Sequence, residues 1–429
     1  MYLRGSKWSM RQRRPRTNWF LIVLVLILIV IVTYVDRFIL PTAQVPGLPT
    51  ATATRDPESY ITEAQGLFDQ GKLSQAIDTY LEAIRIKPDD PATYIALARV
   101  QIFAGRYADA LTNAENALLL SPNNSMANAI RGWALTNQGN YSQADDSLKT
   151  ALRLDQNNGQ AHAYDAFLYG AMYENGTGPY VDPIQTAIAE SQIAINLAPN
   201  SLEAHWARAY ILQITSNYEQ AVTEYQNAIK INKNISEIHL QLGETYKALS
   251  LVDETNINTA LQEYSQANTL NPSDYRPAEY SSRALAYIGD YAKAVQFAEQ
   301  AVKNSPTDPY LRGNWGYMLY KNFEWPAALQ QFDLAVNGGQ SEDGQTILPL
   351  NPTSNSDTWV SKYFYAYAIL LAQSNRCADA LPLTQKILDY FRSDQFAAQN
   401  VDYALSFCTP GQGTPVAQPS KTPVASPTP

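Results

Sequence analysis

A helical hairpin recurs nine times along this chain, and its regular spacing limits the folds that the chain can adopt. The anchor residues of the first copy are Ala64, Leu67, Ala76, Tyr80, Ala83 and Pro88. Those of the second copy are Ala98, Ala110, Ala114, Ala117 and Pro122. The two sets are offset by 34 residues, and a fixed period of this length indicates a solenoid of stacked helical units.

The register of the repeat is carried by small residues at its eighth position, where they let the two helices of a hairpin approach closely. The copies are placed at 57–90, 91–124, 125–158, 159–201, 202–235, 236–274, 275–308, 309–342 and 361–394. Their eighth residues are Ala64, Ala98, Gly132, Ala166, Ala209, Gly243, Ser282, Gly316 and Ala368. Proline at the end of five copies stops the second helix, because it lacks an N–H group and clashes with the preceding turn.

With this period and this spacing, the chain resembles the tetratricopeptide repeat (TPR) family over about three quarters of its length. The resemblance implies an all-α, right-handed solenoid of about nine hairpins over 57–408, closed by a capping helix from about Asp394 to Phe407. Three insertions interrupt the period, around Tyr173–Tyr180, around Leu251–Asn256 and at 343–360. We expect them to form loops, either as binding decorations or as inert length variation.

The N-terminus predicts one transmembrane helix over 19–40. Residues 19–35 carry no charge, and this uncharged stretch is nearly long enough to cross a bilayer. Trp19 and Tyr34 lie where aromatic residues of the membrane interface are expected. The basic segment 1–18 holds six Lys and Arg residues and no acidic one, so the N-terminus is expected in the cytoplasm and the repeats outside it. A cleaved signal peptide is the alternative. Residues 41–56 are predicted to form a Pro/Thr/Ala-rich linker.

Charge and composition constrain the rest of the chain. The formal net charge is −9, and removing the six positive charges of the first 35 residues leaves −15. This balance argues against nucleic acid as a partner of the outer domain. The tail 409–429 contains six prolines and a single charge, Lys421, and is predicted to be disordered.

The only two cysteines, Cys377 and Cys408, are predicted to form a disulfide. In an antiparallel helix pair that turns near residue 392.5, opposed positions have a constant sum of 785, and these two cysteines have that sum. Both lie in the part placed outside the membrane, where disulfides persist. Two buried free thiols are the alternative.

No catalytic motif, cofactor motif or metal-ligand cluster stands out, so the sequence predicts neither an enzyme nor a bound cofactor or metal. His162, His205 and His239 all occupy the fourth position of their copies. Equivalent positions of stacked repeats lie roughly 10 Å apart, too far for three imidazoles to converge on one ion. We therefore expect these histidines to pack in the core.

The resemblance implies a concave groove lined by the first helix of each hairpin. Aromatic and polar residues alternate on that face, as they do at interaction hot spots. Packing between repeats is the competing explanation for them. The predicted groove residues are Arg99, Trp133, Asn137, Tyr164, Phe167, Trp206, Tyr210, Gln213, Lys247, Arg283, Tyr287 and Tyr317.

Two functions fit this sequence. The first is a non-catalytic, membrane-anchored adaptor or scaffold that binds a protein or peptide in its extracytoplasmic groove, for example in envelope assembly or secretion. The second is a carbohydrate- or cell-wall-binding module that stacks sugars on Trp133, Trp206 and the groove tyrosines. Affinity capture from solubilised membranes and retention on isolated cell wall would separate the two.

Overall fold

The computed structural model describes residues 18–35, 37, 55–177, 182–352, 359–391 and 393–408. The chain divides into two units, Met1–Asp56 and Pro57–Pro429. Most of the predicted basic segment and linker, and all of the tail 409–429, lie outside the described residues.

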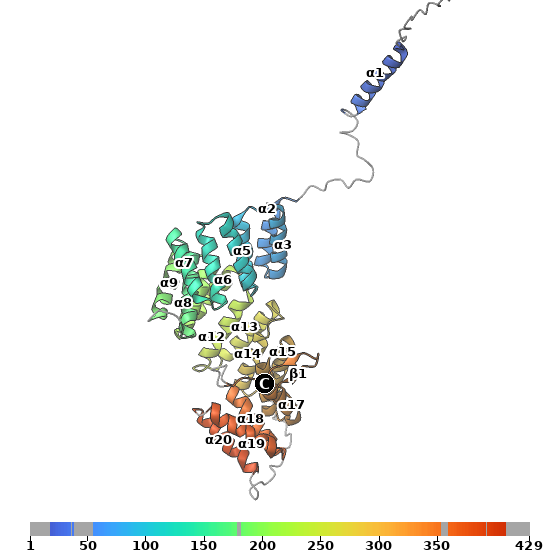
Figure 1. Ribbon diagram of the computed structural model, residues 1–429. Helices are drawn as coiled ribbons and strands as arrows, with labels where there is room; N and C mark the ends of the chain where they lie inside the picture. The colour runs from blue at the N-terminus through green and yellow to red at the C-terminus, as the bar shows by residue number, and fades with distance from the viewer. Residues whose placement is uncertain are drawn as a thin grey trace, which may run out of the picture. The chain divides into compact units, whose positions relative to one another are not determined.

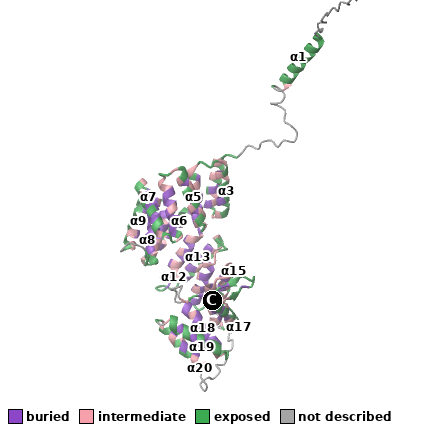
Figure 2. Ribbon diagram, in the orientation of Figure 1, coloured by how far each residue is buried: buried purple, intermediate pink, exposed green. Residues whose placement is uncertain are grey.

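The first unit contains helix α1 (Trp19–Tyr34), which has 16 residues and is apolar on all sides. Its side chains are exposed along its length, as the green colour of α1 in Figure 2 shows. At 1.5 Å per residue a helix of this length spans about 24 Å, less than the roughly 30 Å of a hydrocarbon core. Within the described residues, no helix is both long enough and apolar enough to traverse a bilayer, so the predicted spanning helix over 19–40 is not found.

The second unit is a helical repeat solenoid of nine consecutive hairpins followed by one further helix (Figure 1). The hairpins are α2 (Pro57–Asp69) with α3 (Leu73–Ile86), α4 (Pro91–Phe103) with α5 (Tyr107–Leu120), α6 (Ser125–Asn137) with α7 (Tyr141–Leu154), α8 (Gly159–Glu174) with α9 (Pro183–Leu197), α10 (Leu202–Ile214) with α11 (Tyr218–Ile231), α12 (Ser236–Leu249) with α13 (Asn256–Leu270), α14 (Arg276–Tyr287) with α15 (Tyr291–Asn304), α16 (Pro309–Lys321) with α17 (Trp325–Asn337), and α18 (Trp359–Gln373) with α19 (Cys377–Tyr390). The capping helix is α20 (Gln395–Cys408). The predicted helical-repeat architecture is confirmed.

The first helices of several hairpins begin at a polar cap. Asp90, Asn124, Asn158 and Ser201 each accept a backbone N–H of the first turn of the helix that they precede. Such caps satisfy amide groups that have no partner within the helix. They fix where each repeat begins, which keeps the 34-residue period in register.

The small residues of the eighth position permit the close helix packing that the sequence predicts. A Cβ atom added to Gly132 would lie 2.5 Å from Cγ of Leu148, and one added to Gly243 would lie 2.5 Å from the ring of Tyr264. Both partners belong to the second helix of the same hairpin. A side chain larger than hydrogen would push the two helices apart at these places.

The insertions that we expected to form loops contain some regular secondary structure. The segment after α17 forms a short antiparallel pair, β1 (Gly339–Gln340) and β2 (Thr346–Ile347), with Gly339 opposite Ile347. Helix α18 begins at Trp359, two residues before the predicted start of copy nine. Residues 178–181 of the insertion in copy four lie outside the described part of the chain.

Candidate protein-binding chamber

The first hairpins wind so tightly that the first one contacts the turn between the fifth and the sixth. The side-chain amide of Asn234, just before α12, donates to the carbonyl oxygen of Asp69, at the end of α2, at 2.7 Å. At Gly71, next to this contact, an added Cβ would lie 2.7 Å from the carbonyl oxygen of Asn234. We call hairpins α2–α13 the N-terminal coil. Its inner surface is the face on which the sequence predicts the groove.

Aromatic residues from four first helices fill much of the inside of this coil. The ring of Trp133 stacks on that of Tyr164 with centroids 4.4 Å apart and meets Trp206 edge-on at 6.0 Å. Phe167 lies edge-on to Trp206 at 5.0 Å, and Phe103 stacks on Trp206 from the other side at 5.7 Å. All of them except Phe103 are nearly fully buried; Trp206 retains 8% exposure and Trp133 2%. These predicted groove residues are thus brought together, but largely against one another.

A buried ion pair crosses the same interior. Nε of Arg99 on α4 lies 2.5 Å from Oε1 of Glu203 on α10, and the guanidinium group covers the ring of Phe68 at 4.7 Å. Burial opposes ionisation of Glu203, but the adjacent guanidinium outweighs it and holds the pKa of this carboxyl below its ordinary value. Arg99, which the sequence predicts to contact a ligand, therefore binds a carboxylate of the protein itself.

What remains open inside the coil is a chamber of about 290 Å³. One part of its lining, the aromatic wall, is formed by Phe103, Trp133, Phe167, Trp206 and Tyr210. A second part, the polar wall, comes from copies six and seven, with Ser236, Glu237, Gln241, Asn271, Asp274 and Arg276. The two parts meet where the indole N–H of Trp206 donates to Gln241 at 2.6 Å. The chamber is also lined by Ile102, Ala104, Gly105, Tyr107, Thr136, Asn137 and Ala171.

The charges of the polar wall do not balance. One terminal nitrogen of Arg276 lies 2.7 Å from carboxylate oxygens of both Glu237 and Asp274, so two carboxylates share one guanidinium. Burial raises the pKa of the nearby Tyr107 phenol, and the charge of Glu237 raises it further. The chamber therefore favours a neutral or cationic group over an anion.

Three more of the predicted groove residues have polar partners inside the coil. The amide of Asn137 donates to the carbonyl oxygen of Trp133 at 2.8 Å, and the hydroxyl of Tyr210 donates to Glu174 at 2.5 Å. Gln213 accepts a hydrogen bond of 2.5 Å from the Tyr225 hydroxyl. Asn137 and Tyr210 line the chamber, whereas Gln213 does not.

The remaining predicted groove residues lie outside the chamber. Arg283 contacts the rings of Tyr310 and Trp359 at 5.0 and 5.1 Å, and Trp359 also meets Tyr317 edge-on at 5.7 Å. Lys247 reaches Glu244, one turn away on the same helix, at 4.0 Å. Tyr287 is about half exposed at the end of α14. The predicted set of twelve is therefore divided between the coil and the hairpins that follow it.

Sequence reasoning missed the polar wall. Glu237, Asp274 and Arg276 lie near Tyr107 of copy two only because copies six and seven return toward that copy. Gln241 instead meets Trp206 from the adjacent copy, accepting a hydrogen bond from its indole N–H at 2.6 Å. Counting positions within one repeat places each residue on its own hairpin and carries no information about such closure. One signal was available, namely the concentration of tryptophan and phenylalanine on the inner faces of copies two to five.

The three histidines are bound within the protein at both ring nitrogens. Nδ1 of His205 lies 2.6 Å from Glu224, and Nε2 lies 2.9 Å from the carbonyl oxygen of Pro199. His162 and His239 repeat this arrangement in the neighbouring copies. A carboxylate and a carbonyl occupy the two nitrogens of each imidazole, and the described residues contain no group of three or more potential metal ligands.

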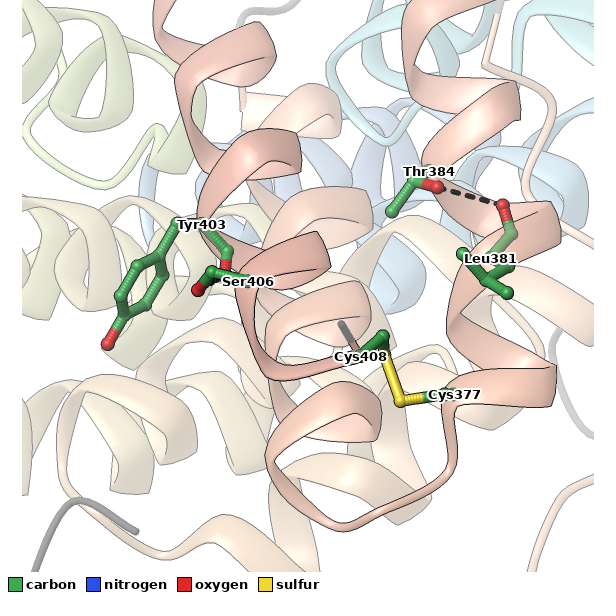
Figure 3. Close-up of a disulfide and its surroundings, with 6 residues drawn as sticks. All are labelled: Cys377, Leu381, Thr384, Tyr403, Ser406 and Cys408. Carbon is green, nitrogen blue, oxygen red and sulfur yellow. Dashed lines mark hydrogen bonds between the residues drawn. A yellow bond between two sulfur atoms is a disulfide. The ribbon is translucent and has the colours of Figure 1, made fainter. Parts of the chain in front are cut away.

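The C-terminal hairpin is closed covalently. Cys377 at the start of α19 and Cys408 at the end of α20 form a disulfide with Cα atoms 5.6 Å apart (Figure 3). The predicted pairing is present, and it ties the capping helix to the last repeat.

Comparison with known proteins identifies the repeat. The family model described as TPR repeat matches residues 65–101 and 215–250, and the one described as Tetratricopeptide repeat matches 95–162 and 247–309. The chain contains tetratricopeptide repeats. No curated protein matches it.

Three solved structures are similar to this chain at low identity. A tetratricopeptide repeat protein from Parabacteroides merdae is 15% identical with a TM-score of 0.39, covering 61% of this chain and 98% of the other. A thermophilic TPR protein of Thermus thermophilus is 21% identical with a TM-score of 0.38, covering 46% of this chain and all of its own. The human IFIT1 dimer with PPP-AAAA is 14% identical with a TM-score of 0.51, covering 81% of this chain and 82% of that one.

Proposed function

We propose that this TPR protein is a non-catalytic adaptor that accepts a segment of another protein in the chamber of its N-terminal coil. The observation that carries the proposal is the pairing of an aromatic wall with a polar wall that keeps an excess carboxylate. Aromatic side chains provide rigid contact area, and an unbalanced carboxylate attracts a cationic or hydrogen-bond-donating group. TPR repeats typically mediate protein–protein interaction, which agrees with this use.

The size of the chamber limits what can enter it. A volume of about 290 Å³ holds one or two side chains and excludes a helix, whose diameter with side chains is about 10–12 Å. The ligand is therefore an extended segment that inserts an apolar side chain beside Trp206 and Tyr210. A neighbouring lysine, arginine or backbone N–H would face Glu237 and Asp274.

The alternative of carbohydrate binding requires a ring face that a sugar can cover. Trp133 and Trp206 each have one ring face stacked against another ring, that of Tyr164 and that of Phe103, and both side chains are almost fully buried. The likeness to IFIT1 extends to the fold alone, and the excess carboxylate of the chamber disfavours an anionic ligand such as the PPP-AAAA of that structure. We therefore propose a protein partner and no nucleic acid.

The location outside the cytoplasm is also part of the proposal. The apolar, exposed side chains of α1 and the six basic residues before it support attachment of the segment 19–40 to a membrane, with the N-terminus inside. A role in envelope assembly or secretion would follow from that location. A reporter that is active only outside the cytoplasm, fused after Pro410, tests it; activity of a cytoplasm-only reporter at that point would contradict it.

Filling the chamber tests the adaptor function more cleanly than truncating its walls. Ala171→Phe would place a ring in the chamber, whereas Trp206→Ala would remove packing from three other rings as well as contact with a ligand. Ala108→Phe, at an exposed position of α5, adds the same side chain outside the chamber and is the matched control.

The measurement is affinity capture from solubilised membranes, followed by titration of the protein that is recovered. We expect Ala171→Phe to weaken binding tens-fold and Ala108→Phe to leave it unchanged, with equal helical signals for both variants. Equal capture by the two variants, or retention of the unmodified chain on cell wall stripped of protein, would reject the chamber as a protein-binding site.

A further inference from the structure

The hairpin turns of copies six, seven and eight expose apolar side chains. Leu251 and Val252 follow α12, and Val252 is 92% exposed. Tyr287 and Ile288 lie at the end of α14, and Phe323, which is 66% exposed, follows α16. We call these five residues the turn-edge stripe.

Most other copies carry glycine or a polar residue at the position that Phe323 occupies in copy eight. In copies one, two, three, five, seven and nine these residues are Gly71, Gly105, Gly139, Ser216, Gly289 and Asn375. The exposed phenylalanine is therefore a property of copy eight and not of the repeat itself.

Phe323 is the residue of the stripe that folding explains least. It has a φ of +64°, in the left-handed region that side chains rarely adopt. At the same position of the repeat, Gly71, Gly105, Gly139 and Gly289 have φ angles between +72° and +80°, and Ser216 and Asn375 have +62° and +59°. The turn of the repeat thus imposes this conformation, which glycine adopts without strain and at which a phenylalanine costs free energy.

The exposure of Phe323 gives no compensation for that cost, since its ring contacts Trp325 at 6.4 Å and otherwise faces solvent.

The turns of the stripe are adjacent along the solenoid. Nζ of Lys321, two residues before Phe323, lies 5.3 Å from the ring centre of Tyr291, which follows the turn of copy seven. Successive hairpins lie roughly 10 Å apart, so three turns extend over about 20 Å. An α-helix of about 14 residues has this length.

Acidic side chains accompany the stripe. Asp253 and Glu254 directly follow Val252, and Glu324 directly follows Phe323; all three are exposed. Asp290 of the middle turn is neutralised by Lys293 at 2.8 Å. With Lys321 counted, the edge carries an excess of two negative charges, which favours a partner with basic residues beside its apolar surface.

We propose that copies six to eight dock an amphipathic helix of another protein, apolar along one face and basic at its flanks, across the turn-edge stripe. This surface is separate from the chamber and would serve whether or not the chamber binds a ligand. Its apolar side chains enter the apolar face of the helix, and its three acidic residues pair with the flanking lysines or arginines.

Phe323→Gly is the decisive variant because it removes the exposed ring and relieves the strain together. Weaker binding by this variant cannot be attributed to unfolding if its melting temperature is unchanged or higher. Val252→Ser removes a second stripe residue without touching Phe323. Leu119→Ser, at an 81% exposed leucine of α5, is the matched control away from the stripe.

The probe is a labelled 14-residue helical peptide with leucines along one face and lysines beside them, titrated with the full chain in one non-ionic detergent. A second peptide replaces the lysines by glutamates. We expect the lysine peptide to bind at least tenfold more tightly than the glutamate peptide. Phe323→Gly should weaken it at least tenfold, and Val252→Ser several-fold. Leu119→Ser and the chamber variant Ala171→Phe should bind like the unmodified chain.

Three results would overturn the proposal. They are a lysine peptide that fails to bind the unmodified chain, equal binding by Phe323→Gly, and equal affinity for both peptides. Phosphatidylcholine vesicles provide the last test. If they bind the chain in a way that depends on Phe323, the stripe faces a lipid surface and the proposed partner is wrong.

Discussion

The N-terminal coil and the C-terminal hairpins are built from the same repeat but are held together differently. In the coil, Arg99 pairs with Glu203 and Asn234 bonds to Asp69, contacts that join positions 104 and 165 residues apart in sequence. In copies eight and nine, stabilising contacts join adjacent repeats, as when Tyr367 donates to Asp333 at 2.8 Å. There a disulfide closes the end of the array.

This difference changes how stability is distributed. A solenoid whose repeats touch only their neighbours behaves as a sum of local terms and can open from an end. Closure of the coil adds contacts between distant repeats, so its hairpins should open together. The C-terminal hairpins should open one by one, with the disulfide delaying the last of them. Four measurements would break or sharpen this comparison.

The largest effect is expected from Glu203→Ala. This variant leaves Arg99 buried inside the coil without its carboxylate, and breaking a buried pair in this way typically costs 3–5 kcal/mol. Denaturant unfolding should show the loss across all hairpins of the coil. Glu82→Ala removes an exposed partner of Arg85 and should leave the stability of the coil almost unchanged. Similar losses in both variants would show that the crossing pair does not join the coil.

The next effect concerns the disulfide. Cys408→Ser opens a bond between cysteines 31 positions apart, worth roughly 3–4 kcal/mol by the chain-entropy argument. Amide hydrogen exchange should accelerate in α19 and α20 while the coil keeps its protection. Equal acceleration in α4–α11 would mean that the two regions unfold as one. Thiol labelling of the unfolded, unreduced chain checks that the bond forms in solution.

A matched pair of glycines tests the closure itself. Gly71 and Gly105 have nearly equal φ angles, +74° and +72°, so alanine at either position pays the same left-handed cost of about 1–2 kcal/mol. Only at Gly71 would the added Cβ meet the carbonyl oxygen of Asn234. Gly71→Ala should therefore lower the free energy of unfolding by about 1–3 kcal/mol more than Gly105→Ala does. If the two alanine variants have equal melting temperatures, the contact between the first hairpin and the turn that precedes the sixth is absent in solution.

The smallest effect is a pH dependence. The hydrogen bond to Glu224 raises the pKa of His205 above its ordinary 6.5, and the same bond lowers the pKa of Glu224 below 4.5. The stability that the raised pKa of His205 contributes to the fold is thus complete below about pH 6.5 and is lost as the pH rises through that pKa. The stability that the lowered pKa of Glu224 contributes is lost as the pH falls through the pKa of Glu224. His205→Gln should be less stable by under about 1 kcal/mol near pH 6, since the pair is partly exposed. The deficit should shrink by pH 9. A deficit independent of pH would indicate a packing effect.

The hairpins could be predicted because their causes are local. The glycine or alanine at each eighth position and the polar residue before many first helices act within one repeat. The pairing of Cys377 with Cys408 was accessible for the same reason, since it depends only on an antiparallel hairpin turning near residue 392. The proposed span over 19–40 was not reproduced, because α1 ends at Tyr34.

Of the candidate site, the sequence predicted the aromatic wall but not the polar wall. Its aromatic wall was recognisable, since Trp133, Phe167, Trp206 and Tyr210 occupy inward positions of consecutive first helices. Whether an inward ring meets a ligand or another ring depends on how tightly the array winds. Trp206 shows the consequence, because it touches Phe103, Trp133 and Phe167 and has little surface left for a partner.

By itself, the sequence determined the helical repeat, its register, the paired cysteines and an interior rich in aromatic residues. The tertiary structure decided that the first six hairpins wind into a coil whose distant repeats touch. It also decided that Arg99 forms an ion pair with Glu203, and that a small chamber lined by Trp206 and by the carboxylates of copies six and seven remains. The physical reason is that the rotation between neighbouring hairpins accumulates along the array. Each hairpin adds a small rotation set by packing against its neighbour, and only the sum over six of them determines whether distant repeats meet.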